Sequence, residues 1–526
     1  MNIKDKIKKI DATIILAFVL ISISLLYNFQ EIISLPPYSL HQWRQADALS
    51  ITLNYFKEGM DFLNPKMHFQ RSIEGRGVGE FPIIYYFNAA VWHITGQSNT
   101  TARLLNIIIA FMGFIALQKA SFILLKDKFY SIIIPVFVFT SSLYSFYLSS
   151  FLVNVDAISF VFISWYFIVK YWKSKKLIHL IAFSVAITFA GLLRPTVLLG
   201  LAPFYLIFFL ELIGVLKGKL FKNKTMSFVF LLAPVAVVAV WLIYAMSYNS
   251  TYNSVYFLTK LRPIWAESNA EITRIFKAFY SGLLPWVFHY GIEIILGILL
   301  VFSLIFVNKQ NKYLAIFWIT IFIEIIVYLL LWFLNLDVHD YYLLEILMLI
   351  PPLLLSVFYG LKKNKIELFN SVILKSVVLI IVLFSIAYNS IVIRANYKIT
   401  ERTATEFFLS KSDVEYWDWY HWQYDKKFRA YETITPYLRE IGLKRDDIVI
   451  SLIDYSPNIS LYFMDQKGFT SLYQVHKTVG EQIKGFKDQG AKYLIINDTN
   501  MYNNNEFSEY RKNRIGSYKN IEIYKL

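Results

Sequence analysis

Two residue types suited to phosphate and acid–base chemistry lie three positions apart near the start of the chain, at Arg44 and Asp47. They belong to the segment His-Gln-Trp-Arg-Gln-Ala-Asp, which begins at His41. Apolar residues recur at helical spacing around it, at Ala46, Leu49, Leu53 and Phe56. The pattern predicts a short helix with Asp47 in its first turn, where the helix dipole favours the ionised carboxylate. Such a carboxylate could deprotonate a hydroxyl beside a phosphate held by Arg44; the alternative is an ordinary helix-start acid with an arginine on the helix face.

The composition places these residues in a membrane protein. Of 526 residues, 56% are hydrophobic and 17% are charged, against about 25% charged in a typical soluble protein. Uncharged runs of about 20 residues, the length that crosses a bilayer, recur between Thr13 and Val392. We therefore expect a polytopic α-helical membrane protein. The absence of cysteine excludes disulfides and thiolate chemistry.

The apolar runs predict about 11 transmembrane helices. The expected spans are Ala12–Ile33, Ala102–Leu125, two in Phe129–Val169, two in Leu177–Leu216, Phe228–Tyr248, Pro285–Val307, two in Tyr313–Gly360, and Leu368–Val392. A long first loop, residues 34–100, contains the apolar piece Phe81–Ile94, which is short for a span. We expect a re-entrant or interfacial helix there, with a short span as the alternative.

The lysines indicate the orientation in the membrane. Lysine-rich connections occur at Met1–Asp11, Lys126–Lys128, Lys170–Lys176, Lys217–Lys224, Lys309–Lys312 and Lys362–Lys365. With 11 spans they all fall on one side, whereas the turns at Asp156 and Asp340 fall on the other side and lack lysine and arginine. The positive-inside rule then predicts a cytoplasmic N-terminus and an extracytoplasmic first loop and tail. The net charge of +15 is mainly this topology signal, so we expect no nucleic-acid partner.

The tail, residues 394–526, is soluble in composition and predicts a small extracytoplasmic α/β domain beside a membrane domain of residues 1–393. Strands are expected at Asp447–Leu452, Lys492–Asn497 and Ile521–Tyr524, and helices at Thr433–Ile441 and Val479–Asp488. The aromatic segment Tyr416–Tyr424 predicts an anchor at the membrane surface, with stacking on a sugar as the alternative.

Ionisable residues gather where the outer turns are expected. Three turns contribute Asp156, Arg194 and His339-Asp340, and the first loop adds Arg44, Asp47, Arg71, Arg76 and Glu80. Ionisable residues in or near a membrane are costly and usually functional. Carboxylates suit proton transfer or metal binding and arginines suit phosphate, so we expect a polar cluster at the level of the lipid head groups.

In order and spacing these segments resemble the GT-C glycosyltransferases, in the bacterial branch related to protein O-mannosyltransferases and lipid A aminoarabinose transferases. The matching segments are Trp43–Asp47, Gly79–Tyr86, Ala102–Leu105, Asn154–Asp156, Arg194-Pro195 and His339–Tyr342. The resemblance covers about residues 10–360 and extends only loosely to the tail. It implies a GT-C fold in the bacterial inner (plasma) membrane. It also implies transfer of a sugar, with inversion, from a polyprenyl-phosphate donor to a glycan, lipid or protein acceptor.

Together with the residue chemistry, the resemblance gives expected roles. Asp47 and Asp156 are the expected catalytic carboxylates, with Asp47 as the general base that takes the proton of the acceptor hydroxyl. The expected donor-phosphate ligands are Arg44, Arg71, Arg76, Arg194 and His339. The other residues expected to line the site are His41, Trp43, Glu80, Arg103, Asp340, Tyr341 and Tyr342.

Two departures from the family pattern affect these roles. Ala48 follows Asp47 where many relatives have a second acid, which leaves metal use open. Phe81 follows Glu80 where aminoarabinose transferases have a lysine that would touch the lipid phosphate. An arginine of the first loop would replace that lysine.

We assign no metal and expect arginines to stabilise the developing phosphate charge. Any divalent cation would have Asp47, Asp156 and His339 as its ligands, because carboxylates and imidazole are the side chains that bind such ions.

Three other functions remain as alternatives. A transporter would place its site near the bilayer midplane between inverted repeats, but here the ionisable residues lie at one face and no repeat is visible. A polysaccharide polymerase or ligase would be expected to use a large late outer loop, not an acid directly after the first span. A receptor or lipid scaffold would not need Asp47. We therefore favour a membrane glycosyltransferase.

Overall fold

A computed structural model of the chain describes residues 11–254, 261–399, 409–472, 478–498 and 505–526. The chain divides into two compact units. One unit consists of Met1–Ile33, Arg103–Leu242 and Thr259–Arg394, and the other of Ser34–Ala102, Ile243–Leu258 and Ala395–Leu526. The first loop therefore belongs to the same unit as the tail, although about 300 residues of sequence separate them.

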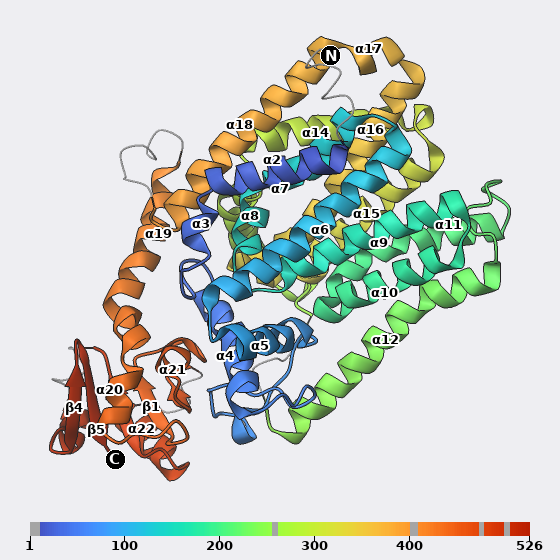
Figure 1. The fold of residues 1–526 in the computed structure, drawn as a ribbon. Coiled ribbons are helices and arrows are strands. Elements are labelled where there is room, and N and C mark those ends of the chain that lie inside the picture. The colour runs from blue at the N-terminus through green and yellow to red at the C-terminus, as the bar shows by residue number, and fades with distance from the viewer. Residues whose placement is uncertain (1–10, 255–260, 400–408, 473–477, 499–504) are drawn as a thin grey trace. The chain divides into compact units, whose positions relative to one another are not determined.

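The first unit is helical (Figure 1). Its helices, three of which extend into the second unit, are α2 (Ala12–Leu26), α3 (Phe29–Ile32), α6 (Asn99–Leu125), α7 (Lys128–Phe139), α8 (Ser142–Leu148), α9 (Asn154–Ser174), α10 (Leu177–Leu193), α11 (Ala202–Leu212), α12 (Lys224–Thr251), α13 (Asn269–Ala278), α14 (Tyr290–Ile305), α15 (Lys312–Leu331), α16 (Ile350–Asn364), α17 (Ile366–Asn370) and α18 (Val372–Asn396).

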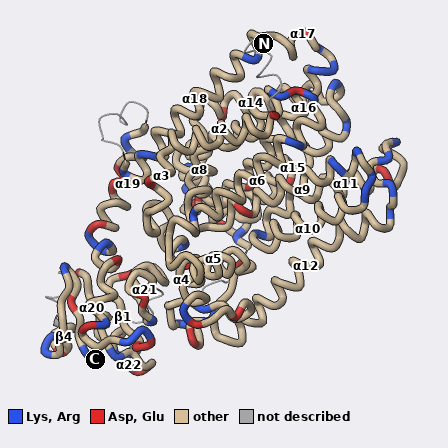
Figure 2. Tube along the Cα trace, in the orientation of Figure 1, with Lys and Arg blue, Asp and Glu red and all other residues tan. Residues whose placement is uncertain are grey.

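Several of these helices can cross a bilayer. Within the described ranges, 7 helices are long and apolar enough, or up to 9 if each of two bent pairs counts as one span. Long stretches of α6, α12 and α18 carry no charged residue (Figure 2). The chain is therefore a multi-pass membrane protein, while the count of about 11 spans stays a prediction.

One bend and one break interrupt spans that we expected to be continuous, and a second bend lies at the start of the expected span Pro285–Val307. α7 and α8 are bent by 76°, and the segment Asn269–Trp286, which contains α13, is bent by 99° against α14. The first span is broken because Asn28 adopts a left-handed backbone conformation, φ 64°, between α2 and α3. Asparagine tolerates this conformation better than most residues. An apolar run shows where a span lies but does not show such a break.

The lysine-rich connections that the structure describes meet at one end of the first unit, while all but Asp11 of the expected connection Met1–Asp11 lies outside the described residues. Lys175 Nζ donates a hydrogen bond to the carbonyl of Lys219 at 2.6 Å, and the ammonium of Lys173 lowers the pKa of Lys126. Lys173 lies in the last turn of α9 and Lys175 directly after it, whereas Asp156 lies in the first turn of the same helix. The described lysine-rich connections therefore gather at the end of α9 opposite Asp156, and the orientation in the membrane stays a prediction.

The second unit combines first-loop helices with a sheet domain. Its elements are α4 (Gln42–Glu58), α5 (Ile83–Thr95), α19 (Lys411–Gln423), α20 (Thr435–Glu440), β1 (Val449–Leu452), α21 (Ile459–Met464), β2 (Gly468–Thr470), α22 (Val479–Asp488), β3 (Tyr493–Ile496), α24 (Ser508–Arg511), β4 (Arg514–Tyr518) and β5 (Ile521–Lys525). The strand order is β2-β1-β3-β5-β4; β1 pairs in parallel with β2 and β3, and β5 pairs antiparallel with β3 and β4. The predicted strands that became β1, β3 and β5, and the predicted helix α22, are confirmed.

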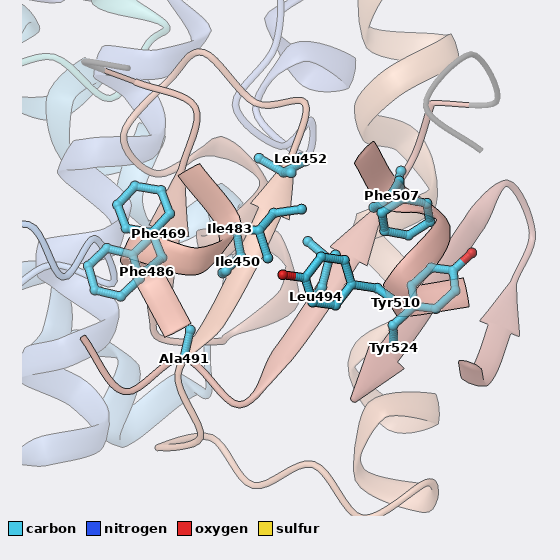
Figure 3. Packing of buried hydrophobic residues seen from close by; sticks show 11 residues of the cluster. Ile450, Leu452, Phe469, Ile483, Phe486, Ala491, Leu494, Phe507, Tyr510 and Tyr524 are labelled. Atoms are coloured by element: carbon cyan, nitrogen blue, oxygen red, sulfur yellow. The ribbon is translucent and has the colours of Figure 1, made fainter. Parts of the chain in front are cut away.

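A compact apolar core holds this sheet against α22 (Figure 3). The rings of Phe469 and Phe486 stack with centroids 4.4 Å apart and planes within 2° of parallel. Ile450 and Leu494, from the paired strands β1 and β3, are fully buried beside them. Replacing a core phenylalanine with alanine costs about 3–5 kcal/mol, so the packing of this small domain is tightly determined.

The first loop adds to the edge of this sheet. The edge strand β2 begins at Gly468, whose N–H donates to the carbonyl of His68 at 3.0 Å and whose carbonyl accepts from the N–H of Gln70 at 2.8 Å. A Cβ at Gly468 would lie 2.2 Å from the carbonyl oxygen of Val449, so only glycine permits the close approach of β2 to β1 at this position. The tail and the first loop are thus joined by backbone hydrogen bonds.

Candidate active site

Asp47 lies in the second turn of α4, so the predicted first-turn position is wrong. The helix begins at Gln42, which makes Asp47 its sixth residue. The backbone N–H of Gln45 donates to the carbonyl of His41 at 3.2 Å, so helical bonding starts before the first residue of the apolar pattern. Because the dipole effect fades beyond the first turn, side chains must stabilise the charge on Asp47.

Two glutamine side chains fasten the start of α4. Gln42 Nε2 donates to the carbonyl of Pro37 at 2.9 Å. Gln45 Nε2 donates to the carbonyls of Tyr38 and Leu40, both at 2.9 Å. Polar side chains that bond the preceding backbone in this way fix the direction in which the chain enters the helix. Arg44 and Asp47 are therefore presented from a rigid helix start.

The Asp47 carboxylate is buried and held from two sides. The residue is only 1% exposed. Its Oδ1 accepts a hydrogen bond from Asn458 Nδ2 at 2.7 Å, and its Oδ2 lies 3.5 Å from Arg44 Nη1. A donor amide and a guanidinium both stabilise the ionised carboxylate. The Asp47 side chain is therefore fixed in orientation by two partners that both favour a carboxylate.

Arg44 connects Asp47 to a second carboxylate. Its Nη2 lies 3.1 and 3.4 Å from the two oxygens of Glu80, and the Tyr85 hydroxyl also donates to Glu80. Burial raises the pKa of Glu80, but Arg44 and Tyr85 more than offset this and hold that pKa below its ordinary value of 4.5. Glu80 is therefore ionised, and one guanidinium bridges two carboxylates.

The other predicted residues of the first loop are Arg76, Arg71, His41 and Trp43. Arg76 pairs with Glu74 at 2.8 Å, donates to the Tyr252 hydroxyl at 2.9 Å and lies 4.5 Å from the centre of that ring. His41, Trp43 and Arg71 are half-buried. Arg76 therefore ties the loop to the residues that follow α12, and its role as a phosphate ligand stays a prediction.

Asp156, in the first unit, lies in the first turn of α9 and is fully buried. Neither of its carboxylate oxygens has a hydrogen-bond partner among the described residues. Nearby, Arg103 of α6 donates to the carbonyl of Ser149 and lies 4.0 Å from the centre of the Phe151 ring, so it fixes the connection that leads into α9. A buried carboxylate without donors is costly, which makes Asp156 a candidate to contact a ligand.

The turn after α10 meets the segment that leads into α16. Arg194 forms an ion pair with Glu345, and Thr196 Oγ1 donates to the same carboxylate at 2.5 Å. The guanidinium of Arg194 lies 4.9 Å from the centre of the Tyr342 ring and 5.8 Å from that of Tyr341. A phosphate bound by Arg194 would therefore share this guanidinium with Glu345.

The remaining predicted residues of the first unit join this group. The His339 ring lies 5.4 Å from that of Tyr341, and buried Asp340 accepts a hydrogen bond from the hydroxyl of Tyr147 in α8. The predicted residues brought together in this unit are Arg194, His339, Asp340, Tyr341 and Tyr342.

Several residues of these two groups were not predicted. Glu345 had a signal, since it is a single charge in an apolar run. Tyr85 lies in the matched segment Gly79–Tyr86 without being singled out, and Tyr147 had no signal, because tyrosine is abundant in this chain. Asn458 is 411 residues from Asp47, and nothing in a single sequence links the two.

In the part of the chain that the structure describes, no group of three or more His, Asp or Glu residues could hold a metal ion. Asp47 belongs to one unit, and Asp156 and His339 belong to the other. A divalent cation thus remains a hypothesis based on these three residue types.

No protein-family model matches the sequence, and no curated protein matches it. Solved structures do match. ArnT from Cupriavidus metallidurans in the apo state has a TM-score of 0.57 at 10% identity over 97% of both chains. The same protein bound to undecaprenyl phosphate has a TM-score of 0.54 at 11% identity, again over 97% of both. The chain has the GT-C fold.

A further GT-C structure is a mutant of the arabinofuranosyltransferase AftD from Mycobacteria. It has a TM-score of 0.51 at 11% identity, over 92% of this chain and 36% of that one. This chain therefore spans about a third of AftD but nearly all of ArnT. The predicted GT-C fold is confirmed, and because the likeness to ArnT covers 97% of the chain it includes most of the tail, which the sequence resemblance reached only loosely.

Proposed function

We propose that this protein is a membrane glycosyltransferase that moves a sugar from a polyprenyl-phosphate donor to a hydroxyl acceptor. The observation that carries the proposal is the buried carboxylate of Asp47, held by Arg44 and Asn458. The fold gives this carboxylate a context, because ArnT, which shares the fold, was solved with undecaprenyl phosphate bound.

The proposed reaction inverts the anomeric carbon. Asp47 takes the proton of the acceptor hydroxyl, whose oxygen attacks the anomeric carbon. The bond from that carbon to the phosphate oxygen breaks, and its electron pair leaves with the polyprenyl phosphate. Cations beside that phosphate are worth more in the transition state than in the ground state, because the negative charge grows as the bond breaks. The proposed donors to the phosphate are Arg44, Arg71, Arg76, Arg194 and His339.

Two further carboxylates have proposed roles. Glu80 holds the guanidinium of Arg44 from the side away from Asp47, which fixes the orientation of that cation. Asp156 is proposed as a second catalytic carboxylate, supported by its complete burial and by the lack of a hydrogen-bond partner among the described residues.

The proposed reaction takes place at the outer face of a bacterial inner membrane, with the N-terminus in the cytoplasm. The meeting of the lysine-rich connections at the end of α9 opposite Asp156 supports this orientation. A hydrophobic donor tail requires a membrane site, and the acceptor is a glycan, a lipid or a protein.

The test uses purified full-length protein with a panel of undecaprenyl-phosphate sugars and a mixture of envelope acceptors, with products read by mass spectrometry. Asp47→Asn keeps the size and one acceptor oxygen of the side chain but removes the base, so turnover should fall by about 10²–10⁴-fold. Asp61→Asn, at an exposed position of the same loop, is the matched control and should retain activity.

Each outcome has a definite reading. Wild-type turnover by correctly folded Asp47→Asn would remove Asp47 as the base. Failure of the wild type to transfer sugar from any donor would overturn the proposed function. Movement of a donor across proteoliposomes without transfer would favour the transporter.

A further inference from the structure

Asn458 lies at the carboxyl end of the central parallel strand of the tail domain. Strand β1 has parallel neighbours on both sides, β2 and β3, and Asn458 closes the loop between β1 and α21. In open α/β sheets, loops at the carboxyl ends of parallel strands next to such a change in strand order are the usual binding position. In this chain the loop contacts α4 of the first loop.

The loop is held rigid by one buried carboxylate. Asp454 is 1% exposed and accepts hydrogen bonds from the backbone N–H and the hydroxyl of both Ser456 and Ser460, at 2.6–2.9 Å. The Ser456 hydroxyl oxygen also accepts from the N–H of Ile459. The start of α21 is thus capped without the side chain of Asn458, although asparagine at this position often forms the cap itself.

The amide of Asn458 is used for contacts with the first loop. The residue is fully buried. Its Oδ1 accepts from the backbone N–H of Phe69 at 3.1 Å, and its Nδ2 donates to Asp47 Oδ1 at 2.7 Å. A backbone N–H can only donate, so the contact with Phe69 fixes which end of the amide is oxygen. The N–H₂ group therefore faces the Asp47 carboxylate.

A second set of contacts surrounds this pair. Ser50 Oγ lies 2.8 Å from His68 Nδ1, and His68 Nε2 lies 3.3 Å from Asp465 Oδ1. Arg445 pairs with Asp465 at 2.7 Å and also with Glu58 at the end of α4. The tail is thus joined to α4 at Glu58 as well as at Asp47, so the hydrogen bond to Asp47 is set by the domain contact and not by one flexible side chain.

We infer that Asn458 is a positioning residue for the catalytic base, so that the tail domain completes the active site by holding Asp47 in its reactive orientation. The inference rests on the proposed function, since it assigns a purpose to a contact of the proposed base. Asn458 acts through Asp47 and does not itself bind substrate.

Removing the amide should affect turnover and not donor binding. Asn458→Ala should lower kcat by about 10–100-fold, the effect expected when a hydrogen bond to a charged group is lost. The KM for the donor should stay unchanged, because the carboxylate would become misoriented without any change in the residues that hold the phosphate.

The pH–rate profile of an isosteric variant, Asn458→Asp, distinguishes a positioning role from a merely structural one. Asn458→Asp keeps the size of the side chain but places a second carboxylate beside Asp47. Two carboxylates at this distance share a proton instead of both ionising. The other charged groups are Arg44, which pairs with Asp47, and Glu80, which pairs with the same guanidinium. The acidic limb of the pH–rate profile should therefore move to higher pH.

Asn497→Asp is the matched control. Asn497 Oδ1 accepts from the N–H of Ile453 at 3.2 Å, and its Nδ2 donates to the carbonyl of Lys427, so this amide bonds to backbone groups of the tail. It lies in the loop after β3, the neighbour of β1. This variant should keep both the wild-type kcat and the wild-type pH profile.

A thermal-unfolding cycle tests the contact without reference to activity. The shift in unfolding temperature caused by Asn458→Ala should be smaller in an Asp47→Asn background than in the wild type. Additive shifts would show that the two side chains do not interact and would overturn the inference.

The activity measurements separate the remaining outcomes. If the wild type transfers sugar but Asn458→Ala changes only KM, or Asn458→Asp keeps the wild-type pH profile, the inference fails and the proposed function stands. If the wild type transfers no sugar but the unfolding shifts are coupled, the contact between Asn458 and Asp47 is real. The proposed function then fails, and the positioning role, which depends on it, fails as well.

Discussion

Replacing Arg44 with lysine should separate its positive charge from its geometry. The guanidinium reaches Asp47 with Nη1 at 3.5 Å and both oxygens of Glu80 with Nη2 at 3.1 and 3.4 Å. A lysine ammonium keeps the charge but is a single point without a planar fork, so it cannot serve both carboxylates at once. One carboxylate then loses its partner, and the phosphate proposed to bind at Arg44 loses a bidentate donor.

The burial of the pair sets the size of the effect. The Arg44 and Glu80 side chains are 20% and 16% exposed, so their ion pair lies between a buried pair, which costs about 3–5 kcal/mol to break, and a surface pair, which is worth about 0–1 kcal/mol. We take about 2 kcal/mol, which corresponds to a loss of about 30-fold in kcat/KM for the donor. Arg44→Ala removes the cation that pairs with both the buried Asp47 and the partly exposed Glu80, and it should cost at least about 100-fold.

The assay is initial-rate kinetics with each substrate varied in turn. Both Arg44 variants should reduce kcat/KM for the polyprenyl-phosphate donor while leaving the KM of the acceptor within about twofold, since less than 0.5 kcal/mol should fall on the acceptor. Lys57→Ala, at an exposed position in the last turn of the same helix, is the control. A change confined to the acceptor KM, or an Arg44→Lys enzyme as fast as the wild type, would refute this reasoning.

Two further predictions concern stability and topology. Arg445→Ala should lower the unfolding temperature by about 4–12 °C relative to the exposed control Lys484→Ala, because about 2–3 kcal/mol of half-buried ion pairs is lost. Burial lowers the pKa of His68. Burial alone would raise the pKa of Asp465, but His68 and Arg445 outweigh this effect and hold the pKa of Asp465 below its ordinary value of 3.8. Both groups bind fewer protons folded than unfolded, so wild-type stability should fall as the pH drops below about 6.5, and stability that rises on acidification would contradict the network. For topology, a cysteine at exposed Ser174 should resist an impermeant thiol reagent in intact cells while one at Lys484 reacts, and the reverse pattern would invert the proposed orientation.

Much of the fold was predictable because membrane spans and buried strands leave strong patterns. Long uncharged runs identified most of the helices of the first unit, and apolar runs bounded by polar residues identified β1, β3 and β5. Strand β2 was missed because Gly468–Thr470 is too short to show alternation; its pairing with β1 and the first loop makes it a strand. The left-handed Asn28 was missed because one residue of backbone geometry breaks an otherwise uniform run.

The candidate site was predictable where its residues lie close together in the sequence or at expected outer turns, as Arg194 and His339–Tyr342 do. Arg44 and Asp47 stood out by their spacing, but the helix start was misplaced because apolar periodicity marks the buried face of a helix and not its first residue. Glu345 was detectable from the sequence, because it is a lone charge in an apolar segment. Asn458 could not be found, because its contact with Asp47 depends on how two distant segments fold together.

The pairing of Gly468 with the first loop has a consequence for how the protein is made. Asp47 leaves the ribosome 411 residues before Asn458 does, which at about 5–20 residues per second is a delay of roughly 20–80 s. During that interval the first loop lacks its backbone partner Gly468 in β2, and Asp47 lacks the amide of Asn458. A chain truncated before residue 394 would still contain the apolar helices of the first unit, but its Asp47 carboxylate would lack the hydrogen bond from Asn458. If Asn458 positions Asp47 as inferred, a copy without the tail should turn over at least about 10–100-fold more slowly than the full chain, as expected for Asn458→Ala.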